Sequence, residues 1–181
     1  MLRLYHAGFQ VIPSPDVRYG RKNADFGQGF YLTADKTFAQ KWAREQKGRR
    51  TYINCYELDP DGLSVLRLAR GAEWFDYLSR NRAGKPDSLK DYDVITGPVA
   101  PDILYDTQGI LTSGLLRLLL LGPEYDQTVL KTEKAAAHLR FLGADELSAA
   151  ELSAFREAVA REERAYQEVF AGTLSKLLEE D

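Results

Sequence analysis

The chain has 181 residues, 44% of them hydrophobic, and a formal net charge of -3 at pH 7, as expected for one soluble domain with room for an extension. Its apolar runs are too short to cross a membrane and its first residues do not read as a signal peptide. Cys55 is the only cysteine, which excludes an intrachain disulfide framework and a thiolate metal cluster. We therefore expect a cytoplasmic location and no membrane partner.

The modest net charge conceals an uneven distribution. Residues 1–50 contain ten Lys and Arg against four Asp and Glu, whereas residues 141–181 contain four basic and ten acidic residues. A basic half suits a polyanion such as a dinucleotide or a nucleic acid. The alternative is an ordinary solvated surface, and for Arg49 and Arg50 both interpretations remain open.

Taken in chain order, the sequence predicts an α+β fold, because its strands are too scattered for regular βαβ units. Alternating or aromatic-rich stretches predict strands at 2–6, 29–33, 50–58, 65–68, 92–96, 128–131 and 139–142. Apolar residues at helical spacing predict helices at 36–47, 72–81, 110–121, 132–139 and 148–178. Ser148 and Glu151 have the spacing of a capping box at the start of the last helix. The apolar residues of that helix recur every three or four positions and would give it one hydrophobic face.

Two features near the N-terminus are candidates for chemistry. His6 ends the first strand, and Gly27 and Gly29 precede an aromatic strand. A lone strand-end histidine is commonly structural, and with His138 the chain has only two histidines, too few for a three-histidine metal site. The glycine pair is neither a dinucleotide fingerprint nor a phosphate loop, so alone it could simply form a turn.

A pair of aromatic residues strengthens the functional interpretation. Tyr31 lies in the aromatic strand and Trp42 lies eleven residues later in the following helix. A strand–turn–helix arrangement can bring two such rings face to face around a flat heteroaromatic ring such as nicotinamide. The alternative is that both rings belong to the core.

Longer motifs carry a resemblance to a known family. Leu-Tyr-His, at 4–6, followed by Gly-x-Gly-Phe-Tyr-Leu, is similar to the His-Tyr-Glu branch of the ADP-ribosyltransferases. The chain more closely resembles a bacterial family of unknown function, domain of unknown function 3990, assigned to that superfamily. The shared stretches lie at 19–33, 92–100 and 127–135. The likeness covers about residues 1–143, which implies an ADP-ribosyltransferase-like domain of split antiparallel β-sheets flanked by helices, followed by an acidic helical extension at 144–181.

The resemblance implies roles for five residues in binding NAD, the co-substrate. His6 would hydrogen-bond a ribose hydroxyl, and the backbone of Ala7, where the family has glycine, would pair with the nicotinamide carboxamide. Tyr31 and Trp42 would sandwich the nicotinamide. Gln127 occupies the third signature position, which is usually glutamate; it can hydrogen-bond the ribose but cannot carry negative charge.

Further roles follow for the glycine loop and its surroundings. Arg18, Arg21 and Lys22 would bind the pyrophosphate beside the loop that contains Gly27 and Gly29, although each basic residue could equally be surface charge. Glu124 and Asp126 are candidates for the missing negative charge, but strand alternation sends Asp126 away from Gln127. Asp102 is a candidate carboxylate on the substrate side or a turn residue. Asn23 and Asp25 would order the loop. No metal is implied.

These features lead us to expect an NAD-dependent mono-ADP-ribosyltransferase, an enzyme of pentosyl transfer, similar to toxin–antitoxin effectors that modify a macromolecule. The acceptor remains open between protein, DNA, RNA and a small molecule. One alternative is an inactive binding module of the same fold that takes NAD, nucleic acid or protein. Another is an interaction protein whose C-terminal helix docks a small antitoxin-like partner, a second copy of the chain, or its own basic half.

Overall fold

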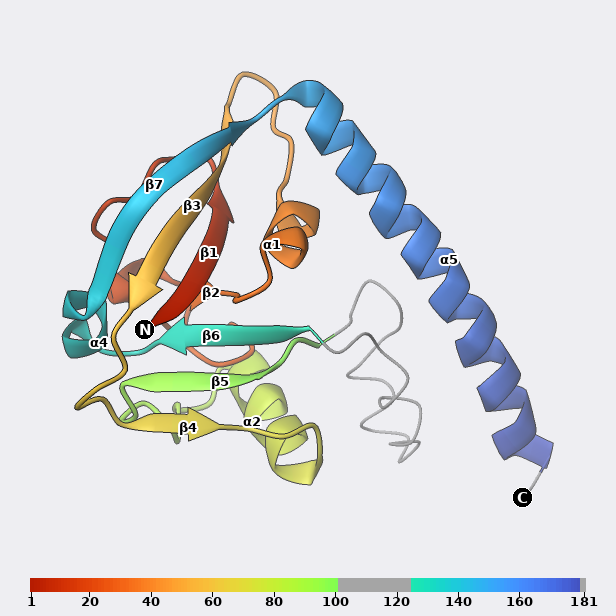
Figure 1. The fold of residues 1–181 in the computed structure, drawn as a ribbon. Coiled ribbons are helices and arrows are strands. Elements are labelled where there is room, and N and C mark those ends of the chain that lie inside the picture. Colours follow the sequence, from red (N-terminus) through yellow and green to blue (C-terminus); the bar gives the residue numbers. More distant parts are fainter. Residues whose placement is uncertain (101–124, 180–181) are drawn as a thin grey trace.

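Two β-sheets, steeply inclined to each other in Figure 1, form the body of the protein. The structure is a computed structural model, and it describes residues 1–100 and 125–179. In the first sheet β3 (Thr51–Leu58) lies between β1 (Leu2–Gly8) and β7 (Leu139–Leu147), antiparallel to both.

The second sheet has the order β2-β6-β5-β4. Its strands are β2 (Phe30–Leu32), β6 (Asp126–Leu130), β5 (Val94–Pro98) and β4 (Val65–Arg67). The β4–β5 pair is parallel and the others are antiparallel. Tyr5 and Thr33 join the two sheets by exchanging backbone hydrogen bonds of 2.8 and 3.0 Å, so the middle of β1 meets the end of β2 where the sheets meet.

Helices cover the sheets and connect their strands. They are the 3-10 helix η1 (Val17–Tyr19), α1 (Lys36–Trp42), α2 (Ala72–Arg82), α4 (Glu133–Ala137) and α5 (Ala149–Glu179). α2 packs Trp74, Phe75 and Leu78 into a core with Ile95 and Val129. None of the helices in the described residues is long and apolar enough to cross a membrane.

The predicted α+β class is confirmed, with sheets that are mostly antiparallel. The helix predicted at 36–47 is too long: it ends at Trp42, because the backbone at Ala43 turns extended and Thr51 draws the Arg44 carbonyl into a 2.7 Å hydrogen bond. The strand predicted at 139–142 is too short, since β7 continues to Leu147. The helix predicted at 110–121, with Asp102 and Glu124, lies outside the described residues.

The last helix is anchored as well as capped. Glu151 N–H donates to Ser148 Oγ at 3.2 Å, and Ser148 N–H donates to Glu151 Oε2 at 2.8 Å, which confirms the predicted capping box. The predicted boundary between residues 143 and 144 lies inside β7. Leu147 and Leu152, beyond that boundary, pack with Ile53 in a buried cluster.

Candidate functional site

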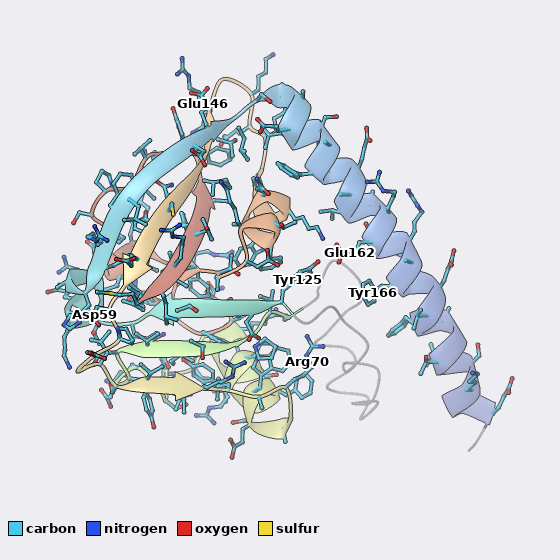
Figure 2. The ribbon with its side chains drawn as sticks, in the orientation of Figure 1. Asp59, Arg70, Tyr125, Glu146, Glu162 and Tyr166 are labelled. Atoms are coloured by element: carbon cyan, nitrogen blue, oxygen red, sulfur yellow. The ribbon has the colours of Figure 1, made fainter. Side chains whose placement is uncertain are left out.

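A cavity of about 620 Å³ opens where the two sheets meet, between α1 and α5. Its size lies within the usual range for small-molecule sites, roughly 300–1,000 Å³. The described residues that line it are Ala7, Gly8, Phe9, Arg21, Ala24, Asp25, Tyr31, Phe38, Lys41, Trp42, Ala43, Arg44, Thr51, Val99, Ala100, Tyr125, Gln127, Val159, Glu162 and Glu163. Tyr125 and Glu162 mark this region in Figure 2, between the beginning of β6 and the middle of α5.

His6 does not line the cavity, although Ala7 and Gly8, which follow it in β1, do. Its Nδ1 atom is 2.8 Å from the carbonyl oxygen of Tyr31, and its ring packs on Phe30 with the centroids 4.6 Å apart. A carbonyl can only accept, so Nδ1 carries a proton. Burial lowers the pKa of His6, which favours the neutral ring. Nε2 is then a hydrogen-bond acceptor, and it lies next to Gly8, where an added Cβ would come within 3.2 Å of it.

Tyr31 is both a wall of the cavity and an anchor for the glycine loop. Its hydroxyl donates to the carbonyl of Gly27 at 2.7 Å and accepts from the Phe26 N–H at 2.9 Å. Burial raises the pKa of this phenol above its ordinary value, so the hydroxyl stays protonated and keeps its donor. The sequence predicted the ring but not this second task.

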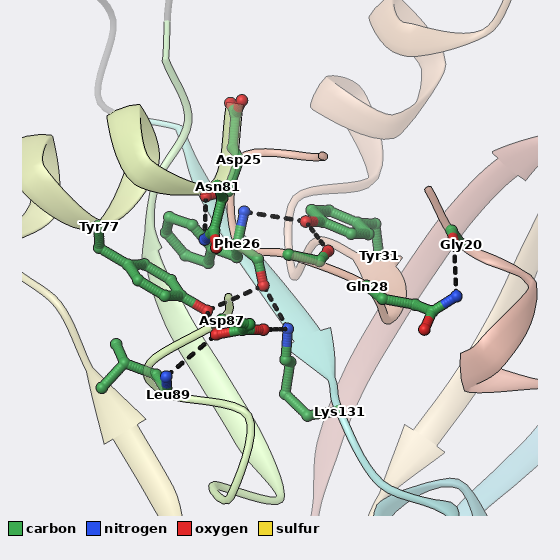
Figure 3. A network of polar contacts seen from close by, with 11 residues as sticks. Gly20, Asp25, Phe26, Gln28, Tyr31, Tyr77, Asn81, Asp87, Leu89 and Lys131 are labelled. Atoms are coloured by element: carbon green, nitrogen blue, oxygen red, sulfur yellow. Dashed lines mark hydrogen bonds and ion pairs between the residues drawn. The ribbon is translucent and has the colours of Figure 1, made fainter. Parts of the chain in front are cut away.

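A buried polar network holds the glycine loop from the other side (Figure 3). Lys131 Nζ forms an ion pair of 2.7 Å with Asp87 and also donates to the Phe26 carbonyl. The Tyr77 hydroxyl lies 3.0 Å from the same carbonyl and 2.9 Å from Asp87. Burial lowers the pKa of Lys131, and the Asp87 carboxylate opposes that shift. None of these contacts was foreseen, because they join segments far apart in the sequence.

Close packing explains why glycines occupy positions 27 and 29. A Cβ on Gly27, whose φ is +70°, would lie 2.3 Å from a carboxylate oxygen of Asp87. A Cβ on Gly29 would lie 2.6 Å from the Leu130 carbonyl. Neither glycine lines the cavity, so both act by letting the loop pack closely. Asp25 orders the same loop, as predicted, through a 2.7 Å ion pair with Arg82.

Gln127 is a buried polar residue in the wall of the cavity. It lies in β6 opposite Gly97, its residue is only 2% exposed, and it lines the cavity. Its Nε2 has no hydrogen-bond partner among the described residues. A buried amide without a partner is uncommon and costs about 1–3 kcal/mol. Asp126, the neighbouring carboxylate, faces the other way and pairs with Arg67 at 3.1 Å, as strand alternation predicted.

The aromatic wall differs in detail from the predicted sandwich. Tyr31 and Trp42 both line the cavity, and Trp42 remains 38% exposed. Two further rings line the cavity beside Trp42: Phe38 stacks on Tyr125 with the centroids 4.3 Å apart and contacts Trp42 at 4.9 Å. The sequence analysis missed Tyr125. Its signal was the two-residue spacing from Gln127, which places both side chains on one face of an extended chain.

The predicted basic residues separate into two groups. Arg21 lines the cavity. Arg18 instead pairs with Asp16 at 3.0 Å and with Glu133 at 3.1 Å, beside a different surface hollow. Lys41, which the sequence analysis did not single out, faces the cavity from α1. In the described residues, no cluster of His, Cys, Asp and Glu is arranged to hold a metal ion.

A compact polar cluster closes the α5 side of the cavity. Lys41 Nζ donates to Glu162 Oε2 and to the Tyr125 hydroxyl, both at 2.8 Å, and Tyr125 donates to Glu162 Oε1 at 2.6 Å. The hydrogen bonds from Lys41 and Tyr125 lower the pKa of Glu162 against the opposing effect of burial. Glu162 is therefore an ionised carboxylate on the cavity wall.

Fold and site together define an α+β protein with an aromatic-lined cavity where two mostly antiparallel sheets meet. Residues 2–141 match the family described as "Protein of unknown function (DUF3990)", and the chain belongs to that family. No curated protein matches the sequence. The match ends within β7, so α5 and its Glu162 lie beyond the region that defines the family.

Proposed function

We propose that the protein is an NAD-dependent mono-ADP-ribosyltransferase that uses this cavity to bind NAD. The observation that carries the proposal is the buried amide of Gln127, a cavity-lining residue whose Nε2 has no hydrogen-bond partner among the described residues. A ribose hydroxyl of the bound dinucleotide would satisfy it. The neighbouring aromatic rings suit a nicotinamide, whose cationic form gains from their faces.

The other cavity residues suit the remaining parts of the dinucleotide. The Nε2 lone pair of His6 would accept a hydrogen bond from a ribose hydroxyl across Gly8. The backbone of Ala7 would pair with the carboxamide, and Arg21 and Lys41 supply positive charge for the pyrophosphate. Arg18 has no part in this proposal, because it pairs with acids at another hollow.

The reaction needs positioning and charge stabilisation more than proton transfer. The bond between nicotinamide nitrogen and ribose C1′ breaks, and its electron pair leaves with the nicotinamide. Positive charge develops on the ribose in the transition state, and a lone pair of the acceptor forms the new bond to C1′ while the acceptor's proton passes to solvent. A rigid site aligns the acceptor and stabilises the developing charge.

A second candidate is a binding module that holds NAD without turning it over. Gln127 favours it, because an amide carries no negative charge for the transition state. In either case we expect a macromolecular partner: an acceptor for the enzyme, with a toxin–antitoxin effector as the working hypothesis, or a bound nucleic acid or protein for the module.

The deciding experiment supplies NAD labelled on its adenylate portion. Purified protein is incubated with it and with cell extract, and free nicotinamide and labelled macromolecules are measured. The enzyme releases nicotinamide and transfers label, whereas the module binds NAD and does neither. Arg21→Ala is expected to weaken NAD binding, and Arg18→Ala is the matched control of equal charge change outside the cavity.

A further inference from the structure

α5 runs along one side of the protein and supplies one wall of the cavity (Figure 1). Leu152 and Phe155 pack against the Ile53 cluster, and Phe170 and Leu174 pack against the cluster around Trp74. The helix is thus held on both sides of its midpoint. Phe155 and Phe170 are separated by about 22 Å at 1.5 Å per residue, and Glu162 lies between them.

Glu162 occupies the side of α5 that faces the protein. Phe155, Val159, Glu162, Tyr166 and Phe170 follow one another at spacings of three or four residues, which places them on one helix face. The rest of this stripe is apolar or aromatic. A carboxylate in the stripe is costly unless it is bonded, and its side chain, only 26% exposed, is bonded to Lys41 and Tyr125.

Glu162 and Gln127 line the same cavity, and Tyr125, which also lines it, is bonded to Glu162. Tyr125 and Gln127 are two residues apart where β6 begins, so their side chains point to the same side and their Cα atoms are separated by about 7 Å. Glu162 Oε1 lies 2.6 Å from the Tyr125 hydroxyl. The cavity wall therefore carries, on a different element, the negative charge that Gln127 lacks.

We propose that Glu162 of α5 supplies the carboxylate that stabilises the positive charge developing on the NAD ribose, so that the helix beyond the family match completes the catalytic site. The inference rests on the function proposed above. Lys41 would stay bonded to Glu162 while it binds the dinucleotide. An ammonium has three N–H donors, its bonds to Glu162 and Tyr125 account for two, and among the described residues the third is left for a phosphate oxygen of NAD.

The experiment compares Glu162→Gln with wild type in the nicotinamide-release assay. Glutamine keeps the size and one hydrogen-bond acceptor but loses the charge, so kcat is expected to fall on the order of 100-fold while the KM for NAD changes less than about 3-fold. Glu162→Asp should recover part of kcat. Tyr125→Phe, which keeps the ring on Phe38 but removes one of the two hydrogen bonds to the carboxylate, should fall between. Glu168→Gln, on the exposed side of α5, is the control of equal charge change.

Each outcome separates the two proposals. If wild type releases no nicotinamide with any acceptor source, the proposed function fails and this inference falls with it. If wild type is active and Glu162→Gln keeps its kcat, only this inference is overturned. An increase in kcat on Glu162→Gln also overturns it, since α5 would then restrain the site instead of completing it. A melting temperature equal to that of Glu168→Gln shows that a loss of kcat is not a loss of fold.

Discussion

The Nδ1 atom of His6 and the carbonyl oxygen of Tyr31 lie 2.8 Å apart, which fixes the proton of the histidine ring on Nδ1. This contact joins the first strand of one sheet to the first strand of the other, so it helps hold the sheets together beside the cavity. It also leaves Nε2 as an acceptor beside Gly8. His6 therefore helps to hold the two sheets together, and we propose that its Nε2 also binds a ribose hydroxyl.

Gly8→Ala tests the binding task without removing the ring. The added methyl group would lie 3.2 Å from His6 Nε2 and should block a hydroxyl from reaching it. Loss of one such hydrogen bond costs about 0.5–1.5 kcal/mol, so we expect NAD affinity by calorimetry to fall roughly 2- to 10-fold. Gly172→Ala, which has open space around the new Cβ, is the control. Equal affinity in both variants would leave His6 with its structural task alone.

Trp42 provides an optical test of NAD binding. The chain has two tryptophans, Trp42 at the cavity and Trp74 fully buried, so bound nicotinamide should change the emission of the first. The change should disappear in Trp42→Phe, which keeps Trp74. NAD at about 100 times its dissociation constant should also stabilise the fold by roughly 2.7 kcal/mol in a thermal melt. Unchanged emission and melting at millimolar NAD would contradict binding.

Substitutions at Gln127 distinguish an enzyme from a binding module. As part of the enzyme, Gln127→Ala should lower nicotinamide release far more than NAD affinity, because its amide acts on the transition state. Gln127→Glu should keep or raise release by restoring a carboxylate at the family's usual position. The measurement is kcat and KM for NAD beside calorimetric affinity. Similar losses in turnover and affinity for Gln127→Ala would instead indicate uniform binding.

Local sequence signals were enough for most of the fold. Alternation predicted β1 and β3, and the Ser148–Glu151 spacing predicted the start of α5, because such features depend on residues close in the chain. Element ends were less predictable. α1 ends at Trp42 because the hydroxyl of Thr51, nine residues later, donates a hydrogen bond to the Arg44 carbonyl. No local sequence pattern predicts that contact.

The site was only partly predictable for the same reason. The sequence predicted one site that includes Ala7, Tyr31, Trp42 and Gln127, and all four residues line the cavity. Glu162 could not be predicted as a site residue, because its sequence surroundings are acidic and typical of a solvated surface. Only the packing of α5 beside Lys41 places its carboxylate at the cavity. The Asp87–Lys131 pair could not be predicted, because its residues are 44 positions apart and neither belongs to a motif that indicates which residue it contacts.

The Asp87–Lys131 pair should be a major support of the glycine loop. The Lys131 side chain is 2% exposed and the Asp87 side chain 18%, so Asp87→Ala would leave a buried ammonium without its partner. We expect a loss of about 3 kcal/mol in the free energy of unfolding, measured in urea. Adding Lys131→Met to Asp87→Ala should recover part of it, since the unpaired charge is gone. Strictly additive losses in this double-mutant cycle would show that the pair is not coupled.

Asp93, the residue before β5, links the start of β4 to helix α4. Its carboxylate accepts from the Ser64 N–H at 2.9 Å, from the Thr132 hydroxyl at 2.6 Å and from Lys134 Nζ at 3.1 Å. Those residues precede β4, cap α4 and lie within α4. These hydrogen bonds, led by that from Thr132, hold the pKa of Asp93 well below its ordinary value of 3.8.

The depressed pKa of Asp93 predicts a specific dependence of stability on pH. A carboxylate whose pKa is lower in the folded than in the unfolded chain contributes stability above the unfolded value, and that contribution is lost as the pH falls from about 4 toward the folded pKa. Asp93→Asn should therefore destabilise the protein by roughly 2 kcal/mol at pH 7, and the difference from wild type should shrink when urea unfolding is repeated at pH 3. Asp61→Asn, at an exposed site, should match wild type at both values. A difference for Asp93→Asn that stays constant between pH 7 and pH 3 would show that its charge contributes nothing and that only its shape matters.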